Sequence, residues 1–139
     1  MGSGRSRSAG AAAPAAAPHD PAESQRLLTA ARRCDAGWLL KALRAGGDPD
    51  VRSKHSGRTA LSFAAQCGDG AEAVRQLLSA RADVHLTSHD GRTALHTAVA
   101  WERGAAVSLL CEHGASRNAA DSHGLTPLSL AERRNNVSF

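Results

Sequence analysis

The sequence predicts an all-α solenoid of about 3.5 stacked helix-turn-helix units with hairpin-like loops between them. A short motif carries this prediction: Gly-Arg-Thr-Ala-Leu at residues 57–61 returns unchanged at 91–95 and as Gly-Leu-Thr-Pro-Leu at 124–128, with spacings of 34 and 33 residues. The composition agrees, since the 139 residues include only two Trp, two Phe and no Tyr. Leu, Val and Ala must therefore build the core, which favours thin, closely packed helices over a large sheet or barrel.

The first 20 residues differ from the rest of the chain. Ala, Pro, Ser, Gly and Arg predominate there, so we expect residues 1–20 to form a flexible tail. The folded domain is predicted over 21–139, as units at about 22–56, 57–90, 91–123 and an incomplete 124–139.

The first helix of a unit is predicted to begin just after a threonine. The hydroxyl of such a residue can accept a hydrogen bond from the first turn of the helix, and the predicted caps are Thr59, Thr93 and Thr126. Pro127 stands at the first helical position, where its missing N–H has no helical partner to lose.

A second helix follows in each of the first three units, and we predict these helices over Ala36–Arg44, Ala71–Ser79 and Ala105–Glu112. They should end where the chain turns left-handed, at Gly46, Arg81 and Gly114. A non-glycine in that conformation costs on the order of 1 kcal/mol, so Arg81 marks the second unit as the weaker one.

These motifs resemble the ankyrin repeat family, whose unit runs Gly-x-Thr-Pro-Leu-His, then Ala-Ala, a short turn, an apolar helix and Gly-Ala-Asp. The closest copy spans residues 91–116, and a degenerate first unit leads into a hairpin-like entry at 46–51. The resemblance covers about residues 22–139. It implies a protein-binding scaffold without catalysis.

The fourth unit stops at Phe139, where its second helix should begin. We therefore expect the face formed by Val107, Leu110 and Cys111 to lack a covering helix. Three explanations stay open: a shortened isoform of a longer ankyrin protein, an edge covered by something else, or a frayed end.

Composition and motifs exclude several classes of protein. No window approaches the roughly 18 apolar residues of a membrane span. Cys34, Cys67 and Cys111 have no metal-clip or redox spacing, and we interpret them as reduced thiols of a cytoplasmic or nuclear protein. No phosphate loop, carboxylate pair or partnered nucleophile is visible, so we expect no enzyme activity, no cofactor and no metal site.

Histidine invites a metal hypothesis, because His85 and His89 are four residues apart. The repeat places both in a hairpin, where solvated side chains are the simpler interpretation. His96 fills the family's Thr-x-Leu-His position, which implies a hydrogen bond near the start of the helix.

The resemblance also implies a binding face. Ankyrin proteins bind partners on the concave side, through hairpin tips and the last residues of each first helix. The candidates here are Arg32, Arg33, Lys54, His55, Arg58, Gln66, His89, Arg92, Trp101, His123, Arg133 and Arg134. An exposed Trp101 beside arginines has the composition of an interface hot spot, whereas its alternative is core packing.

Charge on this face is one-sided. Residues 20–139 carry a net charge of only +2. The helix ends and hairpin tips of the candidate face nevertheless include seven Lys or Arg and only one acid, Asp90. We expect a protein partner with an acidic or phosphorylated segment, and a monomeric chain; solvated charge without a ligand stays an alternative. Nucleic acid is a weaker candidate, because a single-strand platform normally interleaves several aromatics with its basic groups.

The N-terminus carries a separate signal. Met-Gly-Ser-Gly-Arg-Ser at residues 1–6 meets the requirements for N-myristoylation at Gly2 and resembles the starts of Src-type kinases. A membrane-tethered signalling adaptor is therefore an alternative to a soluble module, with peripheral membrane association. A kinase-inhibitor-like regulator is another, because short ankyrin arrays of this size resemble cyclin-dependent kinase inhibitors in layout.

Overall fold

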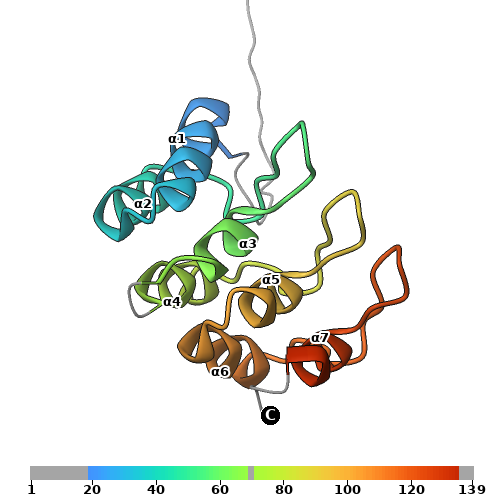
Figure 1. Ribbon diagram of the computed structural model, residues 1–139. Coiled ribbons are helices and arrows are strands. Elements are labelled where there is room, and N and C mark those ends of the chain that lie inside the picture. Colours follow the sequence, from blue (N-terminus) through green and yellow to red (C-terminus); the bar gives the residue numbers. More distant parts are fainter. Residues whose placement is uncertain (1–18, 69–70, 135–139) are drawn as a thin grey trace, which may run out of the picture.

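The computed structural model describes residues 19–68 and 71–134, except for the side chain of Arg134. Most of the predicted tail, with Gly2, lies outside the described residues. Within the described part there are seven helices: α1 (Pro21–Arg32), α2 (Ala36–Arg44), α3 (Ala60–Ala65), α4 (Glu72–Ser79), α5 (Ala94–Ala100), α6 (Gly104–Glu112) and α7 (Pro127–Arg134) (Figure 1).

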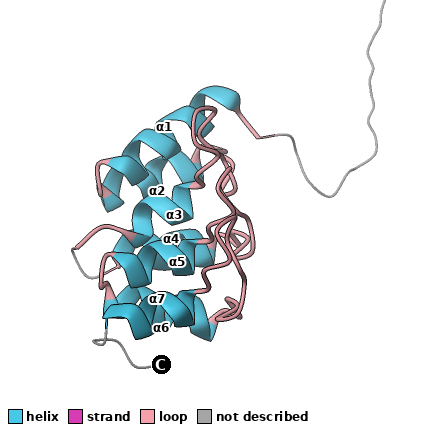
Figure 2. Ribbon diagram, turned by 45° about the vertical axis from the view of Figure 1, so that its right-hand side comes forward, coloured by secondary structure: helices cyan, strands magenta, loops and turns pink. Residues whose placement is uncertain are grey.

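The helices stack in two layers, which confirms the predicted all-α solenoid. The inner layer runs α1, α3, α5, α7, each helix packing on the next, and α2, α4 and α6 form an outer layer behind it (Figure 1). The loops between units project to one side of the stack as finger-like hairpins (Figure 2). The inner helices and the hairpins therefore border the same groove, the concave face.

Equivalent leucines from successive units build the core. Leu27, Leu61 and Leu95 come from the inner helices, and each is at most 1% exposed. Leu77 and Leu110, which are 33 residues apart, repeat the pattern in the outer layer, with no exposed surface. Truncating such a side chain to Ala typically costs about 2 to 5 kcal/mol, so the stack depends on contacts between units.

The predicted helix starts are confirmed. The hydroxyl of Thr59 accepts the Ser62 N–H at 3.1 Å, Thr93 accepts the His96 N–H at 3.4 Å and Thr126 accepts the Ser129 N–H at 3.0 Å. Pro127 is the first residue of α7. Helix α2 has the predicted bounds, while α4 begins one residue later and α6 one residue earlier than predicted.

The left-handed turns after the second helices are also confirmed. Gly46 has φ 103° and Gly114 has φ 88°, and Arg81 adopts φ 67° in the equivalent place. Ala71, just before α4, is left-handed as well at φ 66°, and it makes no side-chain cap. The second unit thus holds two non-glycine residues in a conformation that favours glycine.

The structure corrects the interpretation of the cysteines. Cys34 and Cys67 form a disulfide with their Cα atoms 5.7 Å apart, and Cys111 is free and partly buried. Their separation of 33 residues is one repeat period, so stacking brings the two helix ends together although they are distant in sequence. Spacing rules for cysteine motifs describe local clips and cannot detect such a pair.

The prediction that the third unit has an open apolar edge is also wrong for two of its three residues, Val107 and Leu110. Leu110 has no exposed surface and Val107 is 7% exposed. Helix α6 packs against both α5 and α4, so these side chains point into the stack. Cys111 is only partly buried, yet it too packs against the core.

None of the described helices is long and apolar enough to cross a membrane.

Candidate functional site

Two clefts lie along the groove between the inner helices and the hairpins. The first, called here the Trp101 cleft, has a volume of about 260 Å³ and is lined by Arg58, Ser62, Gln66, Ser88, Asp90, Arg92, Thr97, Ala100 and Trp101. The second, the Arg32 cleft, has a volume of about 610 Å³ and is lined by Pro21, Ser24, Gln25, Leu28, Arg32, Val51, Arg52, Ser53, Lys54 and His55. The structure thus gathers seven of the predicted residues into two neighbouring clefts.

Trp101 is solvent-exposed. It caps the C-terminus of α5, and 52% of its surface is accessible. The Arg103 guanidinium lies 6.0 Å from the ring centroid, and its Nε donates to the Gln66 carbonyl at 3.0 Å. Arg103, which the sequence did not single out, therefore supports one side of the ring while the rest stays open to the cleft.

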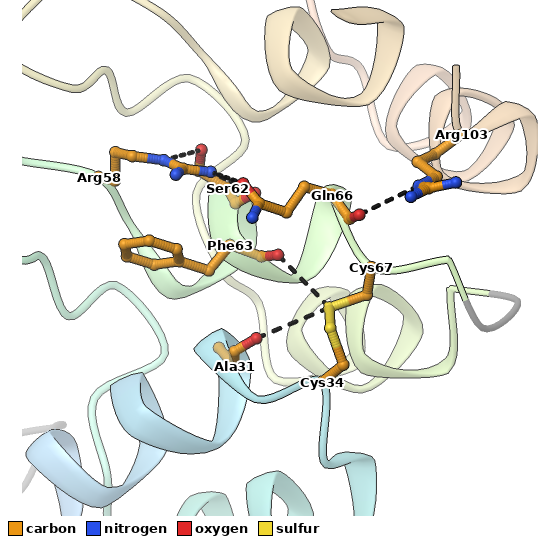
Figure 3. Close-up of a disulfide and its surroundings, with 8 residues drawn as sticks. All are labelled: Ala31, Cys34, Arg58, Ser62, Phe63, Gln66, Cys67 and Arg103. Carbon is orange, nitrogen blue, oxygen red and sulfur yellow. Dashed lines mark hydrogen bonds between the residues drawn. A yellow bond between two sulfur atoms is a disulfide. The ribbon is translucent and has the colours of Figure 1, made fainter. Parts of the chain in front are cut away.

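Arg58 is held against the inner helix α3. Its guanidinium lies 4.2 Å from the Phe63 ring centroid, and it donates to the hydroxyl and the carbonyl of Ser62, both at 3.4 Å, and to the Gln66 side chain (Figure 3). Burial lowers the pKa of Arg58, the nearby Asp90 raises it, and Arg32 lowers it further. The group remains a cation at neutral pH.

Arg32 approaches the same ring from α1. Its guanidinium carbon lies 5.1 Å from the Phe63 centroid, and Nη2 donates to the Ser53 hydroxyl at 3.4 Å. Arg32 lines one cleft and Arg58 the other, so the Phe63 ring and its two guanidinium groups connect them. The sequence did not single out Phe63; the available signal was an aromatic side chain in a first helix whose other residues are Ala, Leu and Ser.

Arg92 has a structural partner. Its Nε donates to the Asp121 carboxylate at 3.2 Å, and that carboxylate is fully buried. Asp121 also accepts the N–H groups of His123 at 2.8 Å and Leu125 at 2.9 Å. Burial raises the pKa of Asp121, but these hydrogen bonds and Arg92 outweigh it and hold the pKa below its ordinary value. Arg92 therefore stabilises the hairpin that contains Asp121 and also lines the Trp101 cleft.

The remaining predicted residues lie outside the two clefts. The Arg33 guanidinium lies 5.9 Å from the Trp38 ring centroid, toward the outer helix α2. His89 covers Gly57 so closely that a Cβ there would come 2.4 Å from its ring, and His123 and Arg133 are exposed further along the stack. The side chain of Arg134 is outside the described residues.

His96, in contrast, is a structural residue, as the resemblance implied. The Thr93 N–H donates to its Nδ1 at 3.1 Å, and its Nε2 contacts the Leu125 carbonyl at 2.9 Å. The ring has no exposed surface. It therefore links the start of α5 to the next hairpin.

A comparison with known families decides the identity of the fold. A family model described as ankyrin repeats matches the chain in three copies, over residues 27–121 and 64–139. This chain belongs to the ankyrin repeat family. Ankyrin repeats imply a protein–protein interaction module.

Curated relatives agree with this assignment. SH3 and multiple ankyrin repeat domains protein 2 from Homo sapiens is 39% identical over 90 residues, which cover 65% of this chain and 5% of that protein. Protein 1 of the same name, also from Homo sapiens, is 38% identical over 90 residues, 65% of this chain and 4% of its own length. The E3 ubiquitin-protein ligase KEG of Arabidopsis thaliana is 37% identical over 89 residues, 64% of this chain and 5% of the relative. The chain thus matches only a small part of each relative.

Proposed function

We propose that this ankyrin array is a non-catalytic module that binds an acidic or phosphorylated segment of a partner protein along its concave face. The observation that carries the proposal is the exposed Trp101 ring, which opens into a cleft shared with Arg58 and Arg92. Large aromatic side chains with neighbouring arginines are typical of interface hot spots.

Charge along the groove supports an anionic ligand. The Arg32 cleft is lined by Arg32, Arg52, Lys54 and His55 and by no acidic side chain. The Trp101 cleft adds two arginines and a single carboxylate, Asp90. A segment with negative side chains would gain charge-assisted hydrogen bonds in both clefts, whereas a basic segment would meet repulsion.

The two clefts are adjacent, which favours an extended ligand. The Arg32–Phe63–Arg58 contact joins them, so one segment running along the groove can reach both. Residues at intervals along such a segment would supply one side chain for the Trp101 ring and others for the arginines. The groove would therefore recognise a pattern of residues along the bound segment rather than one chemical group.

Selection from a randomised peptide display library tests this proposal. The wild-type protein is expected to enrich peptides with Asp and Glu, and Trp101→Ala is expected to lose that enrichment, since truncating a hot-spot residue typically costs about 2 kcal/mol or more. Trp101 is 52% exposed and is not part of the hydrophobic core cluster of the described residues, so the variant should stay folded.

The Lys41→Gln variant is the matched control, because Lys41 is exposed on the outer helix α2. It should select the same peptides as the wild type. Enrichment of neutral or basic peptides, or unchanged enrichment by Trp101→Ala, would reject the concave face as an acidic-segment site.

A membrane-tethered form of the same module is the second candidate, and the Gly2 motif is the observation that favours it. A single myristoyl chain binds membranes only marginally, and Arg5 and Arg7 would add about 1 kcal/mol each on an anionic leaflet. The intact mass of the protein from its own cells tests it. A myristoyl adduct that disappears in Gly2→Ala supports the tether, while an unmodified mass would reject it.

A further inference from the structure

The Phe63 ring holds two cationic side chains from different units. The guanidinium carbons of Arg58 and Arg32 lie 4.2 Å and 5.1 Å from the ring centroid, so one aromatic ring positions both groups. Such cation–π contacts fix the direction of an arginine without neutralising it. The ring thus keeps two like charges near each other.

Neither guanidinium is in an ion pair within the described residues. Arg32 donates to the Ser53 hydroxyl, and Arg58 donates to Ser62 and Gln66, all of which are neutral acceptors. By contrast, Arg26, Arg75 and Arg92 each pair with a carboxylate elsewhere in the described structure. The Nη1 group of Arg58 makes no hydrogen bond to the described residues, so donors remain for a ligand.

The surroundings add positive charge on one side and a single acid on the other. Toward the Arg32 cleft stand Arg52, Lys54 and His55, with the buried Ser53 hydroxyl beside Arg32. Toward the Trp101 cleft stands Asp90, which accepts a hydrogen bond from Ser88 and attracts Arg58 without reaching ion-pair distance. A single carboxylate at a distance leaves the pair of arginines short of negative charge.

We propose that Arg32 and Arg58, held on Phe63, bind the phosphate group of a phosphoserine or phosphothreonine in the partner segment. A phosphomonoester carries a charge of about −1.5 to −2 at neutral pH and three acceptor oxygens, so it can pair with two guanidinium groups beside one ring better than a single carboxylate can. This inference rests on the proposed function, because it assigns one residue of the segment that the concave face binds. It makes the interaction subject to phosphorylation of the partner.

The test uses the whole chain and two capped tripeptides, Ala-phosphoserine-Ala and Ala-Glu-Ala. Selective ¹³C labelling of Phe gives ring signals from only two residues, Phe63 and Phe139, and Phe139→Leu assigns them. At constant ionic strength and about pH 7.5, the phosphopeptide should shift the Phe63 signals saturably, with a Kd about tenfold below that of the glutamate peptide. Near pH 5 its affinity should fall, because the phosphate gains a proton.

Three variants sharpen the test. Arg32→Gln should raise the Kd about tenfold, the loss expected for one charge-assisted contact, and Arg32 is exposed enough to replace without unfolding. Asp90→Asn should lower the Kd, since it removes the acid that competes for Arg58. Arg75→Gln, which removes one charge from the outer helix α4, is the matched control and should leave the Kd unchanged.

Three results would overturn the inference: no saturable shift of the Phe63 signals, equal affinity for the glutamate peptide, or the same loss from Arg75→Gln as from Arg32→Gln. Its failure is distinct from that of the proposed function. If the phosphopeptide binds but peptide selection does not depend on Trp101, only the wider concave-face proposal is rejected. Trp101-dependent selection without phosphopeptide binding would reject only the phosphate site.

Discussion

Cys34 and Cys67 join the first two units through a disulfide at the ends of their inner helices, with the Cα atoms 5.7 Å apart (Figure 3). Cys34 follows α1 in a left-handed conformation, and Cys67 is buried just after α3. Because repeat proteins are held together by contacts between neighbours, a covalent link between two units acts on the interface that stability depends on.

Reducing this disulfide should destabilise the protein. A crosslink that closes a loop of 33 residues stabilises by about 4 kcal/mol in the chain-entropy account, so the Cys34→Ser, Cys67→Ser double variant should lose roughly that from its free energy of unfolding. Urea denaturation measures it. Cys111→Ser is the control, and dithiothreitol should lower its stability as it does that of the wild type. An unaffected midpoint in the double variant would show that the bond contributes little.

The stability of the protein should depend on pH through His96. Burial lowers the pKa of this histidine from its ordinary 6.5, although the Leu125 carbonyl and Asp121 oppose the change. Because Nδ1 accepts the Thr93 N–H, protonation breaks that contact. Below the ordinary pKa, the unfolded chain binds more protons than the native chain. The contribution of neutral His96 to the free energy of unfolding is therefore complete above about pH 6.5 and decreases as the pH drops below it.

Denaturation at about pH 7.5 and pH 5.5 checks this dependence. The free energy of unfolding should fall in the wild type and vary less in His96→Gln, which should also be less stable at the higher pH. His113→Gln removes an exposed histidine on the outer layer and should keep the wild-type dependence. Equal pH dependence in wild type and His96→Gln would contradict the role of His96.

Arg81→Gly should stabilise the second unit. Arg81 has φ 67°, where the first and third units have glycine at the equivalent turn, so the substitution relieves strain of about 1 kcal/mol. Thermal unfolding should show a higher Tm. The reciprocal change, Gly114→Ala, places a side chain in open space but at φ 88°, and it should lower the Tm. A lower Tm for Arg81→Gly would mean that the side chain of Arg81 contributes more than its backbone strain.

Asp121 should matter more for stability than Arg92. Asp121→Ala leaves the N–H groups of His123 and Leu125 without their acceptor and should cost about 3 kcal/mol. Arg92→Ala loses one charge-assisted hydrogen bond to the buried Asp121 carboxylate and should cost about 1.5 kcal/mol. Denaturant titration separates the two. If Arg92→Ala were as costly as Asp121→Ala, the hairpin would depend on the ion pair rather than on the backbone contacts.

The sequence predicted the fold well because its signals are local. A repeated Gly-x-Thr motif places each helix start, and the hydroxyl of Thr59 caps its helix as the motif implies. The left-handed turn at Arg81 followed from alignment with Gly46 and Gly114. Each of these features depends on a few neighbouring residues, which one sequence contains in full.

Features formed between units were harder to predict. The Cys34–Cys67 bond and the Arg32–Phe63 contact join residues from successive units, and the Arg92–Asp121 pair joins residues 29 positions apart. The repeat period brings such positions together, but side-chain direction decides which pairs meet. The family resemblance implied a basic face, but the sequence did not show which of its arginines have partners within the protein.

The affinity of a peptide enriched by the wild-type protein, measured with two double variants of equal charge, tests the central claim most directly. Arg32→Gln with Arg58→Gln removes two charges from the concave face, and Lys41→Gln with Arg75→Gln removes two from the outer helices. If the concave face binds an acidic segment, the first variant should raise the Kd about tenfold or more, while the second stays within about twofold. An equal loss in both variants would mean that net charge alone attracts the peptide, and would contradict a specific concave site.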